Sequence, residues 1–482
     1  MQQTIYPKRI IDCAGVEHAE HLLLRQDLQV DLIEHKLTVF HAGSHIILDY
    51  GKEMRGGIRI LAHSSDLSAV RIRFGESVGE CCAELGAGEE FSGKTQKRQI
   101  SEKAARQNAT NDHAVRDFCV VLPSWSDMPV GDTGFRFVRL DFTGECTVKS
   151  VPCTNTILSR RAKYVYRGDR EIEKIFSVAK RTVDLCAGSG YIWDGIKRDR
   201  LVWVGDLTPE LLALTTLYGR TKEAENTLDF ARRQAVLPDF MNYQPVYSMW
   251  WIIALQEYLS RTGAEDFVQK QMDYLEALVR QLALDVDEDG NMHHVGCFLD
   301  WPHAGKPELM EGVRAINIMA EKAAISLLEH FGRSADVAKQ QLSRLMKQEI
   351  RPVTKLVAAL KYWAVGELSA EEKEILLSGG IAGMSTFMSY YILKAVHAFS
   401  PELAKAMLKE YYGGMLKLGA TTFWEDFEPE QLEGTPIDVL PQEGKSDCHG
   451  DFGMHCYIGF RRSLCHGWSA GVVAYIKECL DV

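Results

Sequence analysis

The sequence predicts two parts: an antiparallel β-sandwich, followed by a closed barrel of paired α-helices. Apolar residues recur at every second position in the first third of the chain and at helical spacing after about residue 160. The helical segments show no repeat of fixed length, which argues against an open solenoid and favours a closed ring. A length of 482 residues is ample for two such domains. We therefore expect a β domain at residues 1–160 and a helical domain at residues 161–482.

The β domain is predicted from short apolar runs within residues 38–151, where apolar and polar residues alternate and glycine-rich breaks separate the runs. Alternation with a period of two is typical of strands that bury one face. The runs are HIILDY, IRILAH, VRIRF, FCVVLP and FRFVRLDF. Between them, the polar segment 93–117 is typical of a long surface loop.

The helical domain begins with a predicted amphipathic helix at residues 170–186, whose apolar positions fall on one face. These positions are Ile172, Ile175, Phe176, Ala179 and Val183. Further helices are predicted at residues 209–220, 222–234, 247–262, 265–284, 310–331, 335–349, 352–363, 383–398, 401–412 and 468–479. In a ring of helix pairs, functional residues are expected in the loops rather than on the apolar faces.

Composition and charge exclude several kinds of partner. Acidic residues outnumber basic ones by 66 to 55 and the net charge is -11, so a nucleic acid is not expected as a partner. No apolar stretch reaches the roughly 18 residues that span a bilayer, so no membrane is expected either. The N-terminus lacks the apolar core of a signal peptide, which predicts a cytoplasmic protein, or a periplasmic or secreted one if a signal has been removed.

The cysteine pattern and the motif content predict no metal and no cofactor. The twelve cysteines form no CxxC pair and are typical of reduced, buried thiols. Cys448, His449, His455 and Cys456 are soft ligands close together in sequence, but adjacent Cys-His side chains rarely converge on one zinc ion. The sequence also contains no P-loop, no GxSxG elbow and no GxGxxG fingerprint after a strand.

The segment 191–210 is the densest in reactive side chains. It interleaves acids, bases and tryptophans, a mixture that is unusual for a solvated surface because indole rings prefer burial. The acids are Asp194, Asp199 and Asp206, the bases are Lys197, Arg198 and Arg200, and the tryptophans are Trp193 and Trp203. From the residues alone, a substrate site and a salt-bridged structural loop are equally open interpretations.

A candidate acid–base residue lies in the segment 419–430. Glu425 stands between Trp424 and Phe427 in the sequence. If these rings bury the carboxyl group, its pKa rises, which suits acid–base catalysis. The alternative is an exposed loop acid beside a tryptophan of the core.

Two short motifs complete the candidate site. The segment 463–471 opens the last predicted helix and contains His466, although a lone histidine is more often a hydrogen-bonded core residue. The segment 297–303 sets Asp300 beside Trp301. Carboxylates among tryptophans suit a sugar, because aromatic rings stack on the apolar faces of pyranoses and two acids share the cleavage of a glycosidic bond. A carbohydrate is therefore the expected substrate.

These motifs resemble those of one enzyme family. DGIKRDRLVWVGD resembles the signature of the family 78 glycoside hydrolases, the bacterial α-L-rhamnosidases, and GATTFWEDF, SLCHGWSAG and FLDW are similar to other barrel motifs of that family. ILDYGKEMRGGIRI, VRIRFGES and GFRFVRLDF resemble the family's β-sandwich. The resemblance implies an N-terminal antiparallel β-sandwich followed by an (α/α)6 barrel. It also implies an inverting exo-glycoside hydrolase that releases terminal α-L-rhamnose from a glycan or glycoside.

The resemblance also implies roles for individual residues. Asp199 stands where the family has its general acid, and Glu425 stands where the family has the general base that activates water. Inversion requires about 6.5–9.5 Å between the two carboxyl groups. Two positions depart from the family pattern: Ile196 replaces a proline, and the RDR segment lacks the glutamate of the commoner R-D-E-R form. The implied substrate-binding residues are Asp194, Arg198, Trp203, Asp206, Trp301, Trp424 and His466.

Two other functions are open at this point. A polysaccharide lyase on the same barrel would eliminate at a uronate in a rhamnosyl-glucuronate-type substrate, with cations to neutralise the uronate and a tyrosine or histidine as base. Its candidates are Lys197, Arg198, Arg200, His466, Tyr243 and Tyr247. The other alternative is a non-catalytic glycan-binding protein, which the departure at Asp199 suggests.

Overall fold

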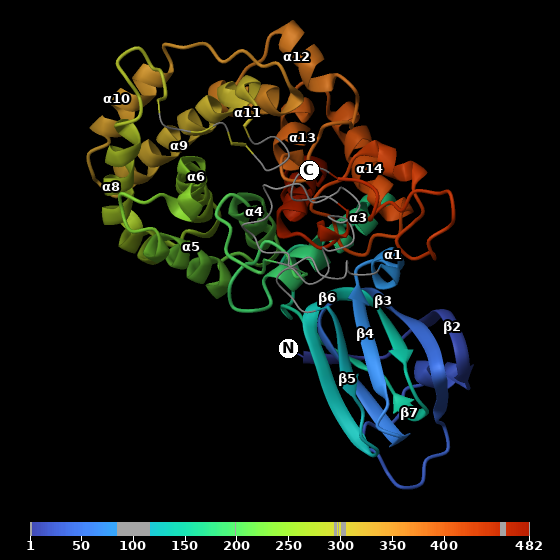
Figure 1. Ribbon diagram of the computed structural model, residues 1–482. Coiled ribbons are helices and arrows are strands. Elements are labelled where there is room, and N and C mark those ends of the chain that lie inside the picture. The colour runs from blue at the N-terminus through green and yellow to red at the C-terminus, as the bar shows by residue number, and fades with distance from the viewer. Residues whose placement is uncertain are drawn as a thin grey trace.

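The chain folds into a β-sheet domain followed by a ring of helices, as Figure 1 shows. The predicted fold class is confirmed. In the described part, the last strand ends at Thr156 and the first long helix begins at Arg170. Most of the predicted loop at 93–117 lies outside the described residues. The computed structural model describes residues 2–83, 116–197, 199–293, 296, 298–299, 305–453 and 459–481.

The strands of the β domain are all antiparallel, in the hydrogen-bonded order β1-β8-β3-β6-β4-β5, with β2 and β7 also paired to β3. Three of them, β1, β2 and β8, lie outside the region predicted from alternation. The bounds are β1 Gln2–Ile5, β2 Arg9–Glu17, β3 Thr38–Ser65, β4 Ala69–Gly75, β5 Asp117–Val121, β6 Ser126–Phe142, β7 Cys146–Ser150 and β8 Cys153–Thr156.

The long strand β3 curls back on itself and so produces the sandwich. Phe40 near its start and Ser65 at its end both pair with Cys146 of β7. The pairing of β3 with β6 is irregular between Asp49 and Met54, where the strand bends. Gly51 provides the positive φ of 85° at this bend, a conformation that a side chain disfavours. The curled sheet encloses an apolar core that includes Leu48, Ile60, Phe74, Val138 and Leu140.

The helices of the second domain lie close to their predicted positions, and α12 is the main addition. They are α3 Arg170–Cys186, α4 Leu207–Tyr218, α5 Lys222–Gln234, α6 Pro245–Thr262, α7 Glu265–Val268, α8 Met272–Ala283, α9 Met310–His330, α10 Asp336–Leu345, α11 Lys355–Val365, α12 Ala370–Leu377, α13 Ser389–His397, α14 Pro401–Lys417 and α15 Val472–Tyr475. Among the described residues, no helix is both long enough and apolar enough to cross a bilayer.

An inner ring of helices closes the barrel. Each of α4, α6, α9, α11, α13 and α15 packs against the next, and α15 returns to α4. The helix α4 is buried on almost every side, because it has neighbours in the ring and an outer layer behind it. By contrast α5, in the outer layer, buries only one face. This difference explains why α4 is apolar nearly throughout while α5 alternates charged and apolar residues.

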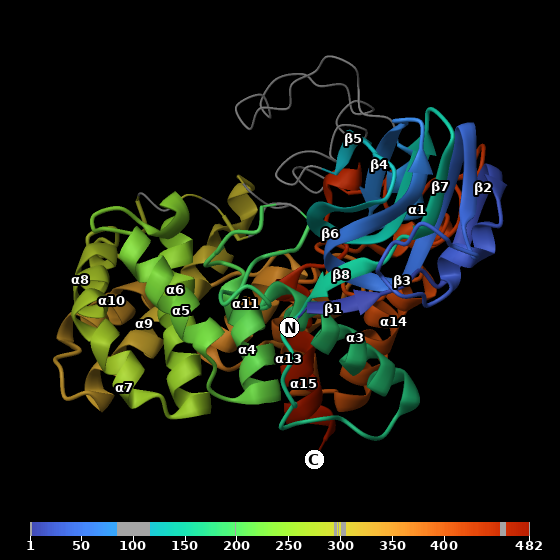
Figure 2. The ribbon, with the colours of Figure 1, turned by 90° about the horizontal axis from the view of Figure 1, so that it is seen from below.

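The β domain lies against one end of the barrel, beside α3 and α14 (Figures 1 and 2). The contact is close enough to require a glycine in β6. A Cβ atom on Gly134 would lie 2.6 Å from Ile196 Cγ1 and 2.9 Å from Lys197 N. The short helix α1 (Val78–Cys82) lies outside the barrel. It belongs to the β domain and follows β4. This junction places β-domain residues next to the loops of the barrel.

Candidate active site

Three of the four predicted site motifs meet at this end of the barrel. Gly195 and His466 form an antiparallel bridge, and Gly467 N donates to Asp194 O at 2.6 Å. Glu425 N donates to Ser463 O at 2.9 Å, and His466 N donates to Phe423 O at 3.0 Å. The first two contacts join segments that lie more than 250 residues apart in the chain, and the other two join the segments around Glu425 and His466. The fourth motif contains Asp300 and Trp301, which lie outside the described residues.

At the centre, one imidazole lies between two buried carboxylates. His466 Nε2 is 3.7 Å from Glu425 Oε1 and 3.8 Å from Asp206 Oδ2. All three residues are at most 4% exposed. Removing carboxylates from water is unfavourable unless nearby groups compensate, so such a cluster points to a functional role. The structure therefore brings together Asp206, Glu425 and His466 of the predicted site.

Glu425 is held firmly by its surroundings. Its Oε2 accepts the Ser463 N–H at 2.8 Å, which leaves Oε1 on the side of His466. Its backbone oxygen accepts bonds from Thr386 Oγ1 at 2.6 Å and from Trp468 Nε1 at 3.0 Å. The carboxylate thus has one anchored oxygen and one oxygen directed into the cluster. This arrangement fixes its direction before any ligand binds.

The loop that contains Asp199 is closed by two hydrogen bonds between Asp194 at its start and Leu201 at its end. Asp194 Oδ1 accepts the Leu201 N–H at 2.9 Å, and Asp194 N donates to Leu201 O at 3.1 Å. Within the loop, Asp199 and Arg200 have positive φ values of 54° and 51°. Such backbone strain at non-glycine residues is common at functional sites. The Asp199 side chain is half-buried, and Arg198 lies outside the described residues.

The predicted tryptophans have different environments. Trp203 is half-buried and contacts Tyr247 edge-on, with ring centroids 6.2 Å apart, and Tyr247 in turn contacts Phe298 at 5.5 Å. Trp424 is fully buried against Phe427 and presents no surface to a ligand in this structure. Trp203 is therefore the better placed of the two to contact a substrate. The role of Trp424 in shaping a pocket stays a prediction.

Sequence reasoning missed Glu210 in the first turn of α4. Its side chain is 1% exposed, and its Oε1 has no hydrogen-bond partner among the described residues. Burial raises the pKa of Glu210 well above its ordinary value, and the nearby Asp206 and Asp194 raise it further. Burial and the two neighbouring carboxylates thus favour the protonated form of Glu210. A signal for it existed: it is the one charged residue in a mostly apolar helix, four residues after Asp206.

Replacing Glu210 with glutamine is expected to remove a pH dependence of stability. Because its pKa is raised by folding, the unfolded chain releases this proton first as the pH rises. The free energy of unfolding therefore falls with pH above the ordinary glutamate pKa, until the folded-state pKa is passed. Urea unfolding from about pH 5 to about pH 8 should show this fall in wild type and a smaller fall in Glu210→Gln. The exposed Glu430→Gln is the control, and equal slopes in all three proteins would contradict the assignment.

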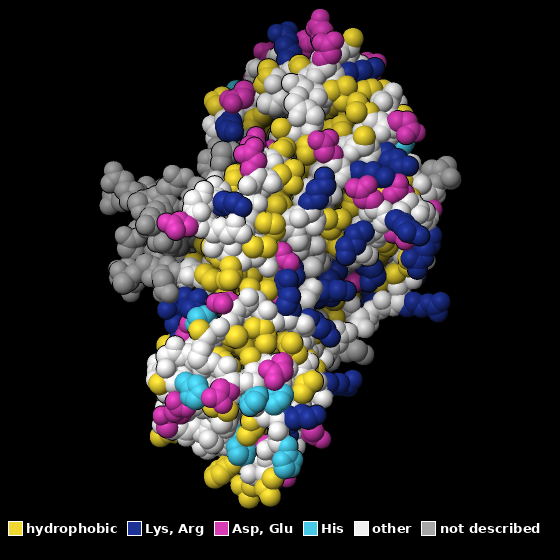
Figure 3. Space-filling view, turned by 90° about the vertical axis from the view of Figure 1, so that its right-hand side faces the viewer, with side chains coloured by type: hydrophobic (Ala, Val, Ile, Leu, Met, Phe, Trp, Pro, Cys, Tyr) yellow, Lys and Arg dark blue, Asp and Glu magenta, His cyan; other side chains and the backbone are white. Residues whose placement is uncertain are grey.

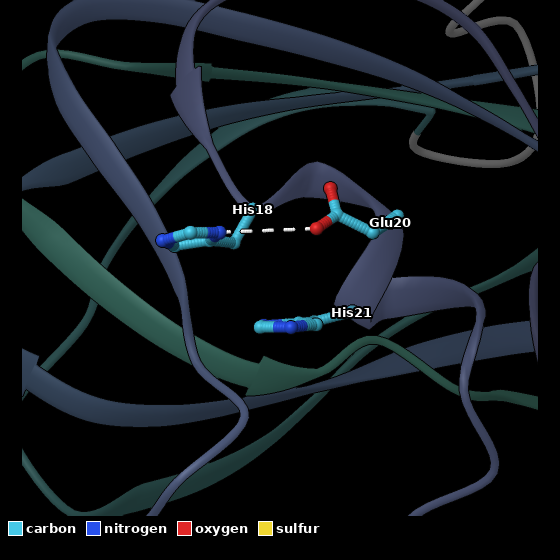
Figure 4. Close-up of side chains that lie close together, drawn as sticks. All are labelled: His18, Glu20 and His21. Carbon is cyan, nitrogen blue, oxygen red and sulfur yellow. Dashed lines mark ion pairs between the residues drawn. The ribbon is translucent and has the colours of Figure 1, made fainter.

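Two groups of potential metal ligands occur in the described residues, and neither is arranged around an ion. His18, Glu20 and His21 lie on the surface of the β domain, where histidines gather in Figure 3. Figure 4 shows the His18 and His21 rings stacked, with centroids 5.3 Å apart and planes 17° apart. Ring lone pairs lie in the ring planes, so stacked rings do not direct them at one point.

The second group, Glu76, Glu80 and His449, is buried at the domain junction. Lys197 Nζ lies 3.1 Å from Glu76 Oε2 and 3.2 Å from Glu80 Oε1, so an ammonium group stands where a metal cation would stand. His449 is bonded through Nδ1 to Ser77 Oγ at 2.8 Å and through Nε2 to the Arg462 carbonyl at 2.9 Å.

Cys448, which adjoins His449, is also buried, and burial raises the pKa of its thiol. His455 and Cys456, the other two residues of the predicted soft-ligand cluster, lie outside the described residues.

The architecture is similar to that of solved α-L-rhamnosidases, one of them described as a member of family GH78. The rhamnosidase from Klebsiella oxytoca with rhamnose bound is 18% identical, with a TM-score of 0.72, and the match covers 99% of this chain and 96% of that one. The GH78 rhamnosidase of Bacillus sp. GL1 is 16% identical, with a TM-score of 0.66. The Streptomyces avermitilis α-L-rhamnosidase complexed with L-rhamnose is 13% identical, with a TM-score of 0.56.

The chain has the GH78 rhamnosidase fold over nearly its whole length, which confirms the resemblance at the level of structure. It spans 48% of the Bacillus chain and 42% of the Streptomyces chain. No family model matches the sequence, and a search of curated proteins finds no match either. At these identities the likeness concerns the fold.

Proposed function

We propose that this protein is an inverting exo-glycoside hydrolase that releases terminal α-L-rhamnose from a glycan or glycoside. The observation that carries the proposal is the buried cluster of Glu425, His466 and Asp206 at one end of a barrel with the rhamnosidase fold. Structures with this fold have been solved with rhamnose bound. The anchored carboxylate of Glu425 provides what a hydrolase needs, a base of fixed direction.

In this proposal Glu425 is the general base and Asp199 is the general acid. Glu425 Oε1 takes a proton from water as the water oxygen attacks the anomeric carbon of the sugar. Asp199 gives its proton to the glycosidic oxygen as the bond between that oxygen and the anomeric carbon breaks. Attack from the face opposite the leaving group inverts the anomeric configuration. His466, between Glu425 and Asp206, orients both carboxylates toward the sugar.

The remaining predicted residues are proposed to bind the sugar. Rhamnose has an apolar C6 methyl group, and the half-buried ring of Trp203, supported edge-on by the buried Tyr247 and Phe298 behind it, is proposed to contact that group. Asp206 and His466, which lie next to each other, are proposed to bond hydroxyl groups of the sugar. Asp194, Arg198, Trp301 and Trp424 complete the proposed set on the strength of the sequence resemblance.

The lyase alternative receives less support from the geometry. Lys197 is fully buried and paired with Glu76 and Glu80, so it is not available to neutralise a uronate. Arg200 is paired with Asp132 at 3.2 Å. Of the candidate tyrosine bases, Tyr243 is 87% exposed, outside the buried cluster. Two of the three cations that a lyase would use are thus already bound to carboxylates of the protein.

The proposal is tested by following the hydrolysis of an aryl α-L-rhamnoside by proton NMR. We expect the aryl alcohol to be released and β-L-rhamnose to appear first, before mutarotation produces the α-anomer. An aryl α-D-glucoside serves as the control and should not be cleaved. Appearance of α-L-rhamnose first would contradict inversion. Binding of rhamnose without turnover of any rhamnoside would favour the non-catalytic binding protein.

A further inference from the structure

Glu76, a residue of the β domain, forms hydrogen bonds with the barrel loop that supports Glu425. Glu76 lies between β4 and α1 and is completely buried. Its Oε1 accepts the Ser463 Oγ–H at 3.2 Å, and its Oε2 accepts the Leu464 N–H at 2.6 Å. Both oxygens therefore bond a single short stretch of the barrel, which lies almost 390 residues away in the chain.

The residue that Glu76 holds is the same residue that holds Glu425. Ser463 N donates to Glu425 Oε2 at 2.8 Å, and Ser463 O accepts the Glu425 N–H at 2.9 Å. Ser463 and Leu464 are each 1% exposed, so these bonds are shielded from water and are correspondingly strong. The path from the β domain to the carboxylate of Glu425 thus runs through one residue.

The charge of Glu76 is balanced by Lys197, which ties a second site loop to the same point. Lys197 Nζ is 3.1 Å from Glu76 Oε2 and donates to the carbonyl oxygens of Phe460 at 2.5 Å and Arg462 at 2.6 Å. Lys197 belongs to the loop pinned by Asp194, whereas Phe460 and Arg462 lead into Ser463. A buried ion pair of this kind is strongly destabilised when one partner is removed.

We propose that Glu76 is a positioning residue of the active site, through which the β domain sets the direction of the Glu425 carboxylate. Glu76 itself bonds Ser463, Leu464 and Lys197, and acts on the reaction only through them. The β domain is on this account a structural component of the catalytic site rather than a separate sugar-binding module. The inference rests on the proposed function, in which Glu425 is the base.

The test compares Glu76→Gln with Glu80→Gln in the full-length protein, using an aryl α-L-rhamnoside. Glu80 is a matched control, because it is almost equally buried and contacts the same lysine. Among the described residues, its side chain accepts hydrogen bonds from Arg116 and from Glu76 N rather than from the Ser463 segment. Glutamine at 76 keeps the shape but replaces one acceptor oxygen by a donor, which opposes Ser463 Oγ–H or Leu464 N–H.

For Glu76→Gln we expect kcat to fall by about 10-fold to about 100-fold, with KM within about threefold of wild type, because a displaced base affects the transition state more than binding. The pH profile of kcat should also shift, since the environment of Glu425 changes. Glu80→Gln should lower thermal stability about as much as Glu76→Gln does, but it should keep kcat within about threefold of wild type. Similar kcat losses in both variants, or an unchanged kcat in Glu76→Gln, would overturn the proposal.

Ser463→Ala provides a second test if Glu76→Gln does not fold. This variant removes the hydroxyl bonds to Glu76 Oε1 and to the Cys465 backbone but keeps the backbone bond to Glu425. We expect a smaller loss of kcat, about threefold to about 10-fold, with the same direction of shift in the pH profile. An unchanged kcat and pH profile would overturn the proposal. If wild type cleaves no rhamnoside, the proposed function fails instead, so the two failures are distinguishable.

Discussion

Replacing Glu425 with glutamine is expected to lower kcat for an α-L-rhamnoside by about 10³-fold, the usual contribution of a general base, while KM changes by less than about threefold. The amide oxygen of glutamine can still accept the Ser463 N–H, so the side chain keeps its place. What is lost is the ability of Oε1 to take a proton from water. Steady-state kinetics together with calorimetric titration of rhamnose would separate turnover from binding.

The control for this substitution is Glu430→Gln, which lies in the short 3-10 helix Pro429–Glu433 that follows Glu425 and is exposed. We expect Glu430→Gln to retain wild-type kcat and KM. If Glu425→Gln keeps more than about a tenth of the wild-type kcat, Glu425 is not the base. The other carboxylate on His466, Asp206, would then be the next candidate.

Replacing Gly467 with alanine is expected to damage the site through packing alone. The added Cβ would overlap Glu210 Oε1 and lie 2.8 Å from its Cδ. Glu210 is almost completely buried, so its carboxyl group cannot swing into solvent to make room. We expect a loss of stability of about 1–3 kcal/mol, typical of an overpacked interior. We also expect the activity of the folded protein to fall, because His466 immediately precedes residue 467 and would be displaced with it.

A double-mutant cycle isolates the cause of this effect. If Gly467→Ala acts by pushing against Glu210, the combination with Glu210→Ala should be less destabilised than the sum of the two single variants. Gly188→Ala is the control, because a Cβ there meets only ordinary contacts at 3.4 Å. Additive losses of unfolding free energy, measured in urea, would contradict the proposed clash.

The sequence pattern was sufficient to predict the fold class but not all of its elements. The change from period two to helical spacing predicted a β part followed by a helical part, and amphipathic segments such as α5 were located to the residue. The strand β1 was missed because its hydrogen-bond partner, β8, lies far along the chain, and β2 was missed because its residues show no clear alternation of burial. The eight-residue α12 was missed because only Leu376 on it is buried.

For the candidate site, local motifs predicted which segments matter, and long-range packing determined what they do. Asp206, Glu425 and His466 were predicted and lie together. Lys197 was a candidate to neutralise a uronate, but the structure commits it to Glu76 and Glu80 of the β domain. Nothing in the local sequence around Glu76 indicates that it bonds Ser463, since that contact exists only after both domains fold. This contact was therefore visible only in the structure.

The most direct test of the central claim is to incubate wild type and Glu425→Gln with a rhamnosyl-glucuronate oligosaccharide. Two products are measured in each sample. Free rhamnose reports hydrolysis, and ultraviolet absorbance reports the unsaturated uronate that only elimination produces. We predict that wild type releases rhamnose with no rise in absorbance, and that Glu425→Gln releases almost none. A rise in absorbance with wild type would contradict hydrolysis and identify a lyase, whereas the absence of both products would exclude this substrate class.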